Sequence, residues 1–221
     1  MPTIETARSW YPENDPVHGF DHILRVYKMA ERLAQAEGAD IEIVRAAALL
    51  HDVNSGQQPV LSHVEGSAVS GGRKTHQHSA ADFAHTILKS EGWPDERIQA
   101  VEHCIRAHRF RDDREQPQSL EAQVLFDADK LDAIGAIGAV RSIAYAVMAE
   151  QPLHAEPSKR FMNSGEKEPG EPHTPYHEHL FKLRVLKERM YTPSGRALAE
   201  ERHRFLENFF EQWQAELRAE R

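Results

Sequence analysis

Residues 40–53 read DIEIVRAAALLHDV, and this stretch decides the fold that we expect. Its apolar residues recur at the three- and four-residue intervals of one helix face, and His51 shares that face. Asp40 is placed to cap the helix, because an aspartate side chain can accept from the free N–H groups of the first turn. Asp52 follows His51 directly, so an imidazole and a carboxylate stand together at the end of a buried helix. The pair is therefore the first candidate for a metal site.

The same periodicity continues over most of the chain. It predicts further helices that begin near Asp21, Ser79, Asp95 and Ser119, and two more at about 176–190 and 195–219. Gly38 ends the first of them. The helix from Ser119 is expected to run through Ile134, with Gly135 and Gly138 inside it, where glycine permits close helix packing. No strand pattern of useful length appears in the sequence, which predicts an all-α fold.

Two stretches break the helical pattern. Residues 53–78 are rich in glycine and polar residues, and residues 150–175 contain five prolines among charged residues. We expect both to be loops, the first with a functional role because it follows the His-Asp pair. For the second, a lid and a tolerated surface insertion are equally open. A chain of 221 residues suits one domain, with a core at 15–145, a flexible loop at 150–175 and C-terminal helices at 176–221.

Composition limits the function. The net charge is -8 and the isoelectric point about 6.0. A general nucleic-acid-binding role is not expected, because phosphate backbones need a dense basic face. The single cysteine, Cys104, cannot form an internal disulfide, which fits a reducing compartment. The N-terminal residues lack the pattern of a signal peptide, and no apolar run approaches the ~18 residues of a membrane span, so we expect a cytoplasmic protein.

Histidine is the unusual residue of this chain, with 14 copies. His22 lies on the apolar stripe of its helix, so we expect it to point inward as His51 does. Imidazole nitrogens and carboxylate oxygens are suitable ligands for divalent metal ions. Consecutive side chains on a helix diverge by ~100°, so an ion between His51 and Asp52 needs further ligands from other helices.

Three segments together resemble a known family. They are HGFDHILRV (18–26), AALLHDV (47–53) and FDADKLDAIGAIG (126–138). Their order of His, His-Asp and Asp resembles the ligand signature of the HD-domain superfamily of metal-dependent phosphohydrolases. The resemblance covers residues 15–145, and residues 181–210 are similar to the C-terminal part of small stand-alone bacterial HD proteins. It implies an HD-type helical bundle with long loops and C-terminal helices.

Carried over residue by residue, the resemblance implies His22, His51 and Asp52 as metal ligands. The fourth ligand is expected among the carboxylates at 127, 129 and 132. Asp129 matches the family pattern best, because it follows an alanine and precedes Lys130.

The other two carboxylates of this helix are candidates for supporting roles around the ion. Asp132 is three residues after Asp129 on the same helix flank, where it could orient a ligand. Asp127 points to another side and is the second choice, as a ligand or as a supporting residue around the ion. Helix-surface charge is the alternative for both.

Other residues are candidates for a second ion or for the substrate. His18 precedes His22 by four residues, and the resemblance implies a phosphate or supporting contact there. His76 and His108 occupy places where a dinuclear branch of the superfamily has two extra ligands. If they hold no second ion, we expect them to face the substrate.

Attack on a phosphate also needs positive charge near its oxygens. Arg25 lies one turn after His22, and Lys130 is next to Asp129, so these two are the first candidates. Arg109 is a further candidate. No residue is identified as the general acid.

The resemblance thus implies hydrolysis of a phosphate ester or anhydride by metal-activated water, with a nucleotide as the favoured substrate. One divalent ion is expected, or two if both extra histidines are ligands; Mn, Fe, Co, Ni, Zn and Mg remain open. Two alternatives are a diiron HD-type oxygenase and a non-catalytic nucleotide-binding signalling module. A homodimer through the apolar stripe of 198–217 is also open.

Overall fold

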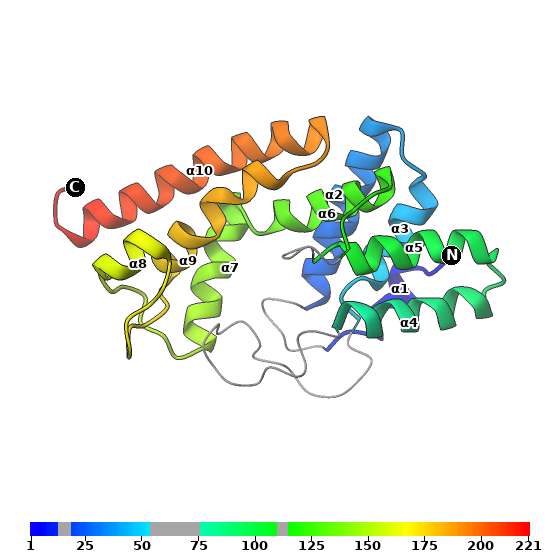
Figure 1. The fold of residues 1–221 in the computed structure, drawn as a ribbon, viewed down its shortest axis with the longest axis horizontal. Coiled ribbons are helices and arrows are strands. Elements are labelled where there is room, and N and C mark those ends of the chain that lie inside the picture. Colours follow the sequence, from blue (N-terminus) through cyan, green and yellow to red (C-terminus); the bar gives the residue numbers. More distant parts are fainter. Residues whose placement is uncertain (13–18, 54–75, 110–114) are drawn as a thin grey trace.

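The computed structural model of this chain describes residues 1–12, 19–53, 76–109 and 115–221. These residues form helices and no strand, so the all-α prediction is confirmed for them. Figure 1 shows an elongated molecule in which the N-terminal helices gather at one end and α7 to α10 at the other. Most of the loop expected at 53–78 lies outside the described residues.

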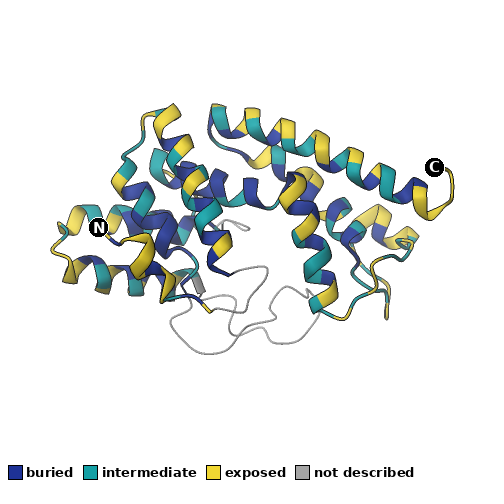
Figure 2. Cartoon of the chain, turned by 180° about the vertical axis from the view of Figure 1, so that it is seen from behind, coloured by how far each residue is buried: buried dark blue, intermediate teal, exposed yellow. Residues whose placement is uncertain are grey.

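The described residues of the N-terminal part form six helices: α1 (Ile4–Arg8), α2 (Phe20–Glu37), α3 (Ile41–Leu50), α4 (His76–Ser90), α5 (Asp95–Ala107) and α6 (Leu120–Asp132). Helices α2, α3, α5 and α6 pack on one another, and α4 packs on α5. Figure 2 shows their buried faces turned to a shared interior. The fully buried side chains there include Ile23, Leu33, Leu49, Leu50, Ile105, Leu125 and Leu131.

Local signals place several helix ends as predicted. Gly38 ends α2 in the left-handed conformation, with φ of 80°. The Asp40 carboxylate accepts from the backbone N–H groups of Glu42 and Ile43 and so caps α3. Two other starts differ from the prediction. Helix α4 begins three residues before Ser79, and Pro94 takes the cap position of α5, so that Asp95 is the first residue inside that helix.

The prediction of a continuous helix through Gly135 and Gly138 is wrong. Helix α6 ends at Asp132, and α7 (Gly135–Met148) starts after a bend of 64°. Gly135 has a φ of 77°, a left-handed conformation that glycine adopts without strain. A Cβ on Gly138 would lie 2.2 Å from the carbonyl oxygen of Ala133. The two glycines thus permit a tight corner.

The described part of the chain contains no single helix that is long and apolar enough to cross a membrane. The bent pair of α6 and α7 meets the length and composition for a span only when the two are counted together.

The C-terminal part contains α8 (Lys159–Ser164), α9 (Pro175–Phe181), the 3-10 helix η1 (Leu183–Arg189) and α10 (Pro193–Leu217). The helix expected at about 176–190 is therefore two helices. The stretch at 150–175, expected to be a loop, includes α8 and a Glu171 carboxylate that accepts from Ser158 and from the backbone of Glu168. Helix α10 packs along α7, α6 and η1, so it joins the two parts.

Candidate metal centre

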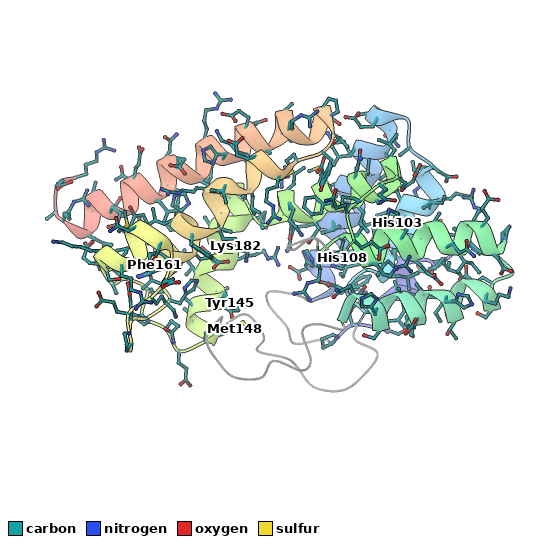
Figure 3. The ribbon with its side chains drawn as sticks, viewed as in Figure 1. His103, His108, Tyr145, Met148, Phe161 and Lys182 are labelled. Atoms are coloured by element: carbon teal, nitrogen blue, oxygen red, sulfur yellow. The ribbon has the colours of Figure 1, made fainter. Side chains whose placement is uncertain are left out.

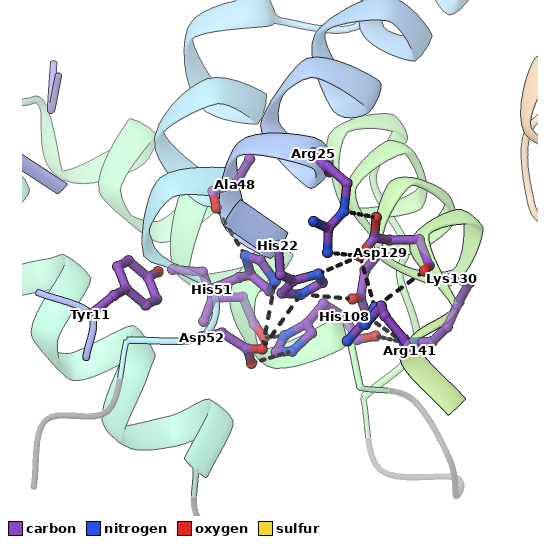
Figure 4. Close-up of polar contacts among 12 residues, drawn as sticks. Tyr11, His22, Arg25, Ala48, His51, Asp52, His108, Asp129, Lys130 and Arg141 are labelled. Carbon is purple, nitrogen blue, oxygen red and sulfur yellow. Dashed lines mark hydrogen bonds and ion pairs between the residues drawn. The ribbon is translucent and has the colours of Figure 1, made fainter. Parts of the chain in front are cut away.

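Three buried histidines from three helices meet in the N-terminal part. His22 lies in the first turn of α2, and His51 and His108 are the C-cap residues of α3 and α5. Each is at most 1% exposed. The ring centroids of His22 and His51 are 5.6 Å apart, and those of His51 and His108 are 5.0 Å apart. Figure 4 shows the three rings in one cluster with Asp52 and Asp129.

Hydrogen bonds fix the orientation of each ring. Nδ1 of His51 and of His108 lies 2.9 Å and 2.5 Å, respectively, from the backbone carbonyl oxygen three residues earlier. Nδ1 of His22 lies 2.7 Å from Oδ2 of Asp132. Because carbonyl and carboxylate oxygens only accept, Nδ1 carries the hydrogen in each ring. In a neutral ring, Nε2 is then the atom with the free lone pair, the form that binds metal ions.

Two carboxylates surround these Nε2 atoms. Asp52 Oδ2 lies 3.8 Å from His22 Nε2 and 3.9 Å from His51 Nε2, and Asp52 Oδ1 lies 3.5 Å from His108 Nε2. Asp129 Oδ1 lies 3.6 Å from His22 Nε2. Ligands about 2.1 Å from one ion are themselves roughly 3–4 Å apart, so this spacing suits a shared ion.

The donors divide into two overlapping groups. The ligand atoms of His22, His51 and Asp129 lie within 4.8 Å of one another, and so do those of His51, Asp52 and His108. His51 belongs to both groups. Among the described residues, its buried Nε2 has no hydrogen-bond partner. Leaving such an acceptor unpaired is costly unless something binds it, and a divalent ion of the Mn-to-Zn series fits the donors.

Burial sets the protonation of the histidines. It lowers the pKa of His108 to about 4, although Asp52 acts to raise it. Burial likewise lowers the pKa of His22, although the hydrogen bond that His22 donates to Asp132 acts to raise it. Both rings are therefore neutral at neutral pH, as metal coordination requires.

Asp129 is held in its ionised form. Burial acts to raise its pKa, but the positive charge of Lys130 holds that pKa well below the usual range. Lys130 Nζ lies 2.6 Å from Asp129 Oδ2. The carboxylate therefore keeps its charge although it is buried.

Asp132 connects this cluster to two arginines. It is 4% exposed and lies beside His22, and it also accepts from Arg25 Nε at 2.7 Å and from Arg141 Nη1 at 2.7 Å. Burial acts to raise the pKa of Asp132, but the hydrogen bonds from His22 and Arg25 have the larger effect and lower that pKa below its usual value. The carboxylate is therefore ionised. Asp132 thus has the geometry to orient His22.

The structure gives Arg25 another role than the expected phosphate contact. All three guanidinium nitrogens bind carboxylates: Nε and Nη2 reach Asp132, and Nη1 reaches Asp21. The Lys130 ammonium group lies near the cluster, but it donates to Asp129 and to the backbone carbonyl of His108.

One expectation for Asp127 was a supporting role around the ion, but its carboxylate binds other residues. Its buried carboxylate accepts from the backbone N–H groups of Tyr191 and Thr192 and from the Thr192 hydroxyl, at 2.7–2.9 Å. These residues precede α10, which Thr192 caps. Asp127 points to the other side of α6, and there it anchors the C-terminal helix.

The remaining candidates are only partly described. His18 lies outside the described residues. His76 is the first residue of α4, but its side chain is not described. Arg109 follows His108 directly at the end of α5 and is half-buried. Sequence reasoning did not identify Arg141, because the corner between α6 and α7 decides where this residue lies.

Known proteins are similar to this chain in sequence and in fold. The model of the HD domain family matches residues 19–134. The uncharacterized protein YpgQ of Bacillus subtilis is 29% identical over 220 residues, which cover 96% of this chain and 93% of YpgQ. Residues 19–134, which the family model matches, contain the five donor residues of the cluster and Asp132. Arg141 lies beyond this range.

Solved structures show the same likeness. The structure of YpgQ in complex with ADP superimposes with a TM-score of 0.69 at 27% identity and covers 97% of both chains. A protein from Lactobacillus plantarum has a TM-score of 0.71 at 28% identity and covers 98% of this chain and 95% of its own. An HD-superfamily hydrolase from Bacillus thuringiensis has a TM-score of 0.64 at 28% identity, with 98% and 97% covered.

Proposed function

This chain belongs to the HD domain family, and from that premise we propose that it hydrolyses a phosphate ester or anhydride with a divalent metal ion. We further propose a nucleotide as the substrate. The hydrolase named among its structural relatives supports the reaction class. The complex of YpgQ with ADP supports the substrate class, because that relative matches this chain over nearly its whole length.

One observation carries this proposal. The Nε2 atoms of His22, His51 and His108 converge with the carboxylates of Asp52 and Asp129 inside a buried cluster. His22, His51, Asp52 and Asp129 would hold the ion, with His108 as a further donor. A divalent ion bound there lowers the pKa of water and offsets negative charge on a phosphate.

The chain's own residues prepare this site. Burial keeps His22 and His108 neutral, and the hydrogen bonds at Nδ1 hold the rings with Nε2 inward. Lys130 keeps Asp129 charged. The donors are therefore oriented before any ligand arrives, which reduces the cost of binding an ion.

A second candidate function, oxidation at a diiron centre, is favoured by the position of His108. It lies 3.5 Å from Asp52 and joins His51 and Asp52 in a second donor group. Because each ring offers only Nε2 as a donor, His51 would serve one ion of such a centre and His108 the other. Iron at two ions per chain, with no phosphate released from nucleotides, would favour this function over hydrolysis.

The test combines metal analysis with a release assay. Purified protein is analysed for bound transition metals, and phosphate and pyrophosphate release is then measured over nucleoside mono-, di- and triphosphates. We expect bound metal and release from at least one nucleotide, with both lost after chelation and restored by a divalent ion. No release from any nucleotide by metal-loaded protein would contradict the proposal.

A further inference from the structure

Helix α7 brings Arg141 into the metal centre from outside the family-matched range. Its Nη1 donates to the Asp132 carboxylate at 2.7 Å and to the Asp132 backbone carbonyl at 3.2 Å. The side chain is only 17% exposed. Figure 4 shows it beside the histidine cluster. Because Asp132 also binds His22, a single carboxylate separates Arg141 from a candidate ligand.

Among the described residues, Arg25, Lys130 and Arg141 lie near the cluster and differ in which of their nitrogens already donate hydrogen bonds. The Nε and Nη2 edge of Arg25 lies on Asp132. Lys130 donates to Asp129 and to a backbone carbonyl. Arg141 uses Nη1, whereas its buried Nε has no hydrogen-bond partner in the described part of the chain. A buried N–H group without a partner lowers the stability of the fold, and a ligand that accepts from it would remove this cost.

The edge formed by Nε and Nη2 is the part of a guanidinium that binds two oxygens at once. Its two parallel N–H groups match two oxygens of a phosphate, and both bonds are strengthened by charge. This edge of Arg141 is not used by Asp132, because both oxygens of Asp132 already accept from Nε and Nη2 of Arg25. We propose that Arg141 binds a phosphate group of the substrate through Nε and Nη2, while Nη1 stays on Asp132.

The direction of α7 agrees with this role. Arg141, Tyr145 and Met148 follow one another at four and three residues, so they share one face of the helix. Figure 3 shows Tyr145 and Met148 on the side of α7 that is turned towards His108. In that view this face of α7 is turned towards the metal centre, which Arg141 contacts through Asp132. The inference rests on the proposed function for the identity of the anion, a phosphate of a nucleotide.

Binding of methylenediphosphonate, a diphosphate mimic that is not hydrolysed, tests this inference. Its affinity for metal-loaded protein is measured by calorimetry in the wild type, Arg141→Gln and Arg141→Lys. We expect both variants to bind about tenfold to a hundredfold more weakly, because charged hydrogen bonds are lost, with the metal content unchanged. Arg202→Gln is the matched control: Arg202 donates to the backbone of Leu131 at the same corner, and its variant is expected to bind as the wild type does.

Three results would overturn the inference. One is wild-type affinity in Arg141→Gln. Another is full rescue by Arg141→Lys, which would show that a charge beside Asp132 is sufficient. The third is loss of the metal from Arg141→Gln, which would make Arg141 a positioning residue for Asp132 and His22. The proposed function fails separately: mimic binding that depends on Arg141, without phosphate release from any nucleotide, would contradict hydrolysis and support this inference.

Discussion

His22 Nδ1 lies 2.7 Å from Oδ2 of Asp132, and the Nε2 atom of the same ring points to Asp52 and Asp129. A carboxylate on α6 therefore fixes the orientation of a ring on α2. Histidines that bind metal ions commonly donate their other N–H to a carboxylate in this way, which orients the ring and makes it a better ligand.

Asp132→Asn should weaken metal binding without removing any proposed ligand. The amide keeps the size of the side chain but loses the charge that holds His22 and two arginines. We expect the metal affinity to fall about tenfold to a hundredfold, measured by titration against a competing chelator. Asp127→Asn on the same helix is the control and should bind metal as the wild type does. Equal affinities in all three proteins would refute the role of Asp132.

Asp127→Asn should instead lower the stability of the fold. Its carboxylate accepts three hydrogen bonds from Tyr191 and Thr192 at the start of α10. We expect the free energy of unfolding to fall by about 1–3 kcal/mol, because buried donors lose their charged partner. Urea unfolding measures this loss. Asp95→Asn, which removes an exposed ion pair with Lys89, should change stability by less than about 1 kcal/mol.

Glu171 should make stability depend on acid pH. Burial acts to raise its pKa, but hydrogen bonds from Ser158, Glu168 and His177 lower it from 4.5 to about 2. A carboxyl group whose pKa is lower in the folded than in the unfolded state stabilises the fold above pH 4.5. This contribution is lost as the pH falls from 4.5 towards 2. The difference in melting temperature between wild type and Glu171→Gln should therefore be larger at about pH 6 than at about pH 3. A difference that does not change with pH would count against this assignment.

Gly138→Ala should disturb the corner that carries Asp132 and Arg141. The new Cβ would lie 2.2 Å from a backbone oxygen, so the backbone must move. We expect a loss of about 1–3 kcal/mol in unfolding free energy, as for other overpacked sites. Gly38→Ala is the comparison, because it meets no atom within 4 Å and adds only left-handed strain, which costs about 1–2 kcal/mol. A Gly138 variant as stable as the wild type would contradict the tight corner.

The sequence predicted the helical class and the buried histidines His22 and His51 better than the connections between helices. Periodicity shows which face of a helix is buried, and so it put His22 and His51 inward. It does not show a sharp corner between two apolar helices. The left-handed Gly135 and its neighbour Gly138 looked like packing glycines inside one helix, although they allow the chain to turn.

Arginine contacts could not be read from spacing alone. Arg25 lies one turn after His22, which suggested a phosphate contact, but Asp132 comes from another helix and occupies its guanidinium edge. Asp127 is the second choice for the site on its sequence, although helical spacing turns it to another side of the helix than Asp129. The packing of α10 on α6 decides its partners instead, and that packing depends on residues far apart in the chain.

Metal content and phosphate release, measured together on wild type and Asp52→Ala, test the central claim most directly. The account predicts that the wild type holds a divalent ion and releases phosphate or pyrophosphate from a nucleotide. Asp52→Ala should do neither, while its circular dichroism shows the same helix content. An Asp52→Ala protein with wild-type metal content and wild-type release would contradict the claim that this carboxylate helps to hold the ion that hydrolysis needs.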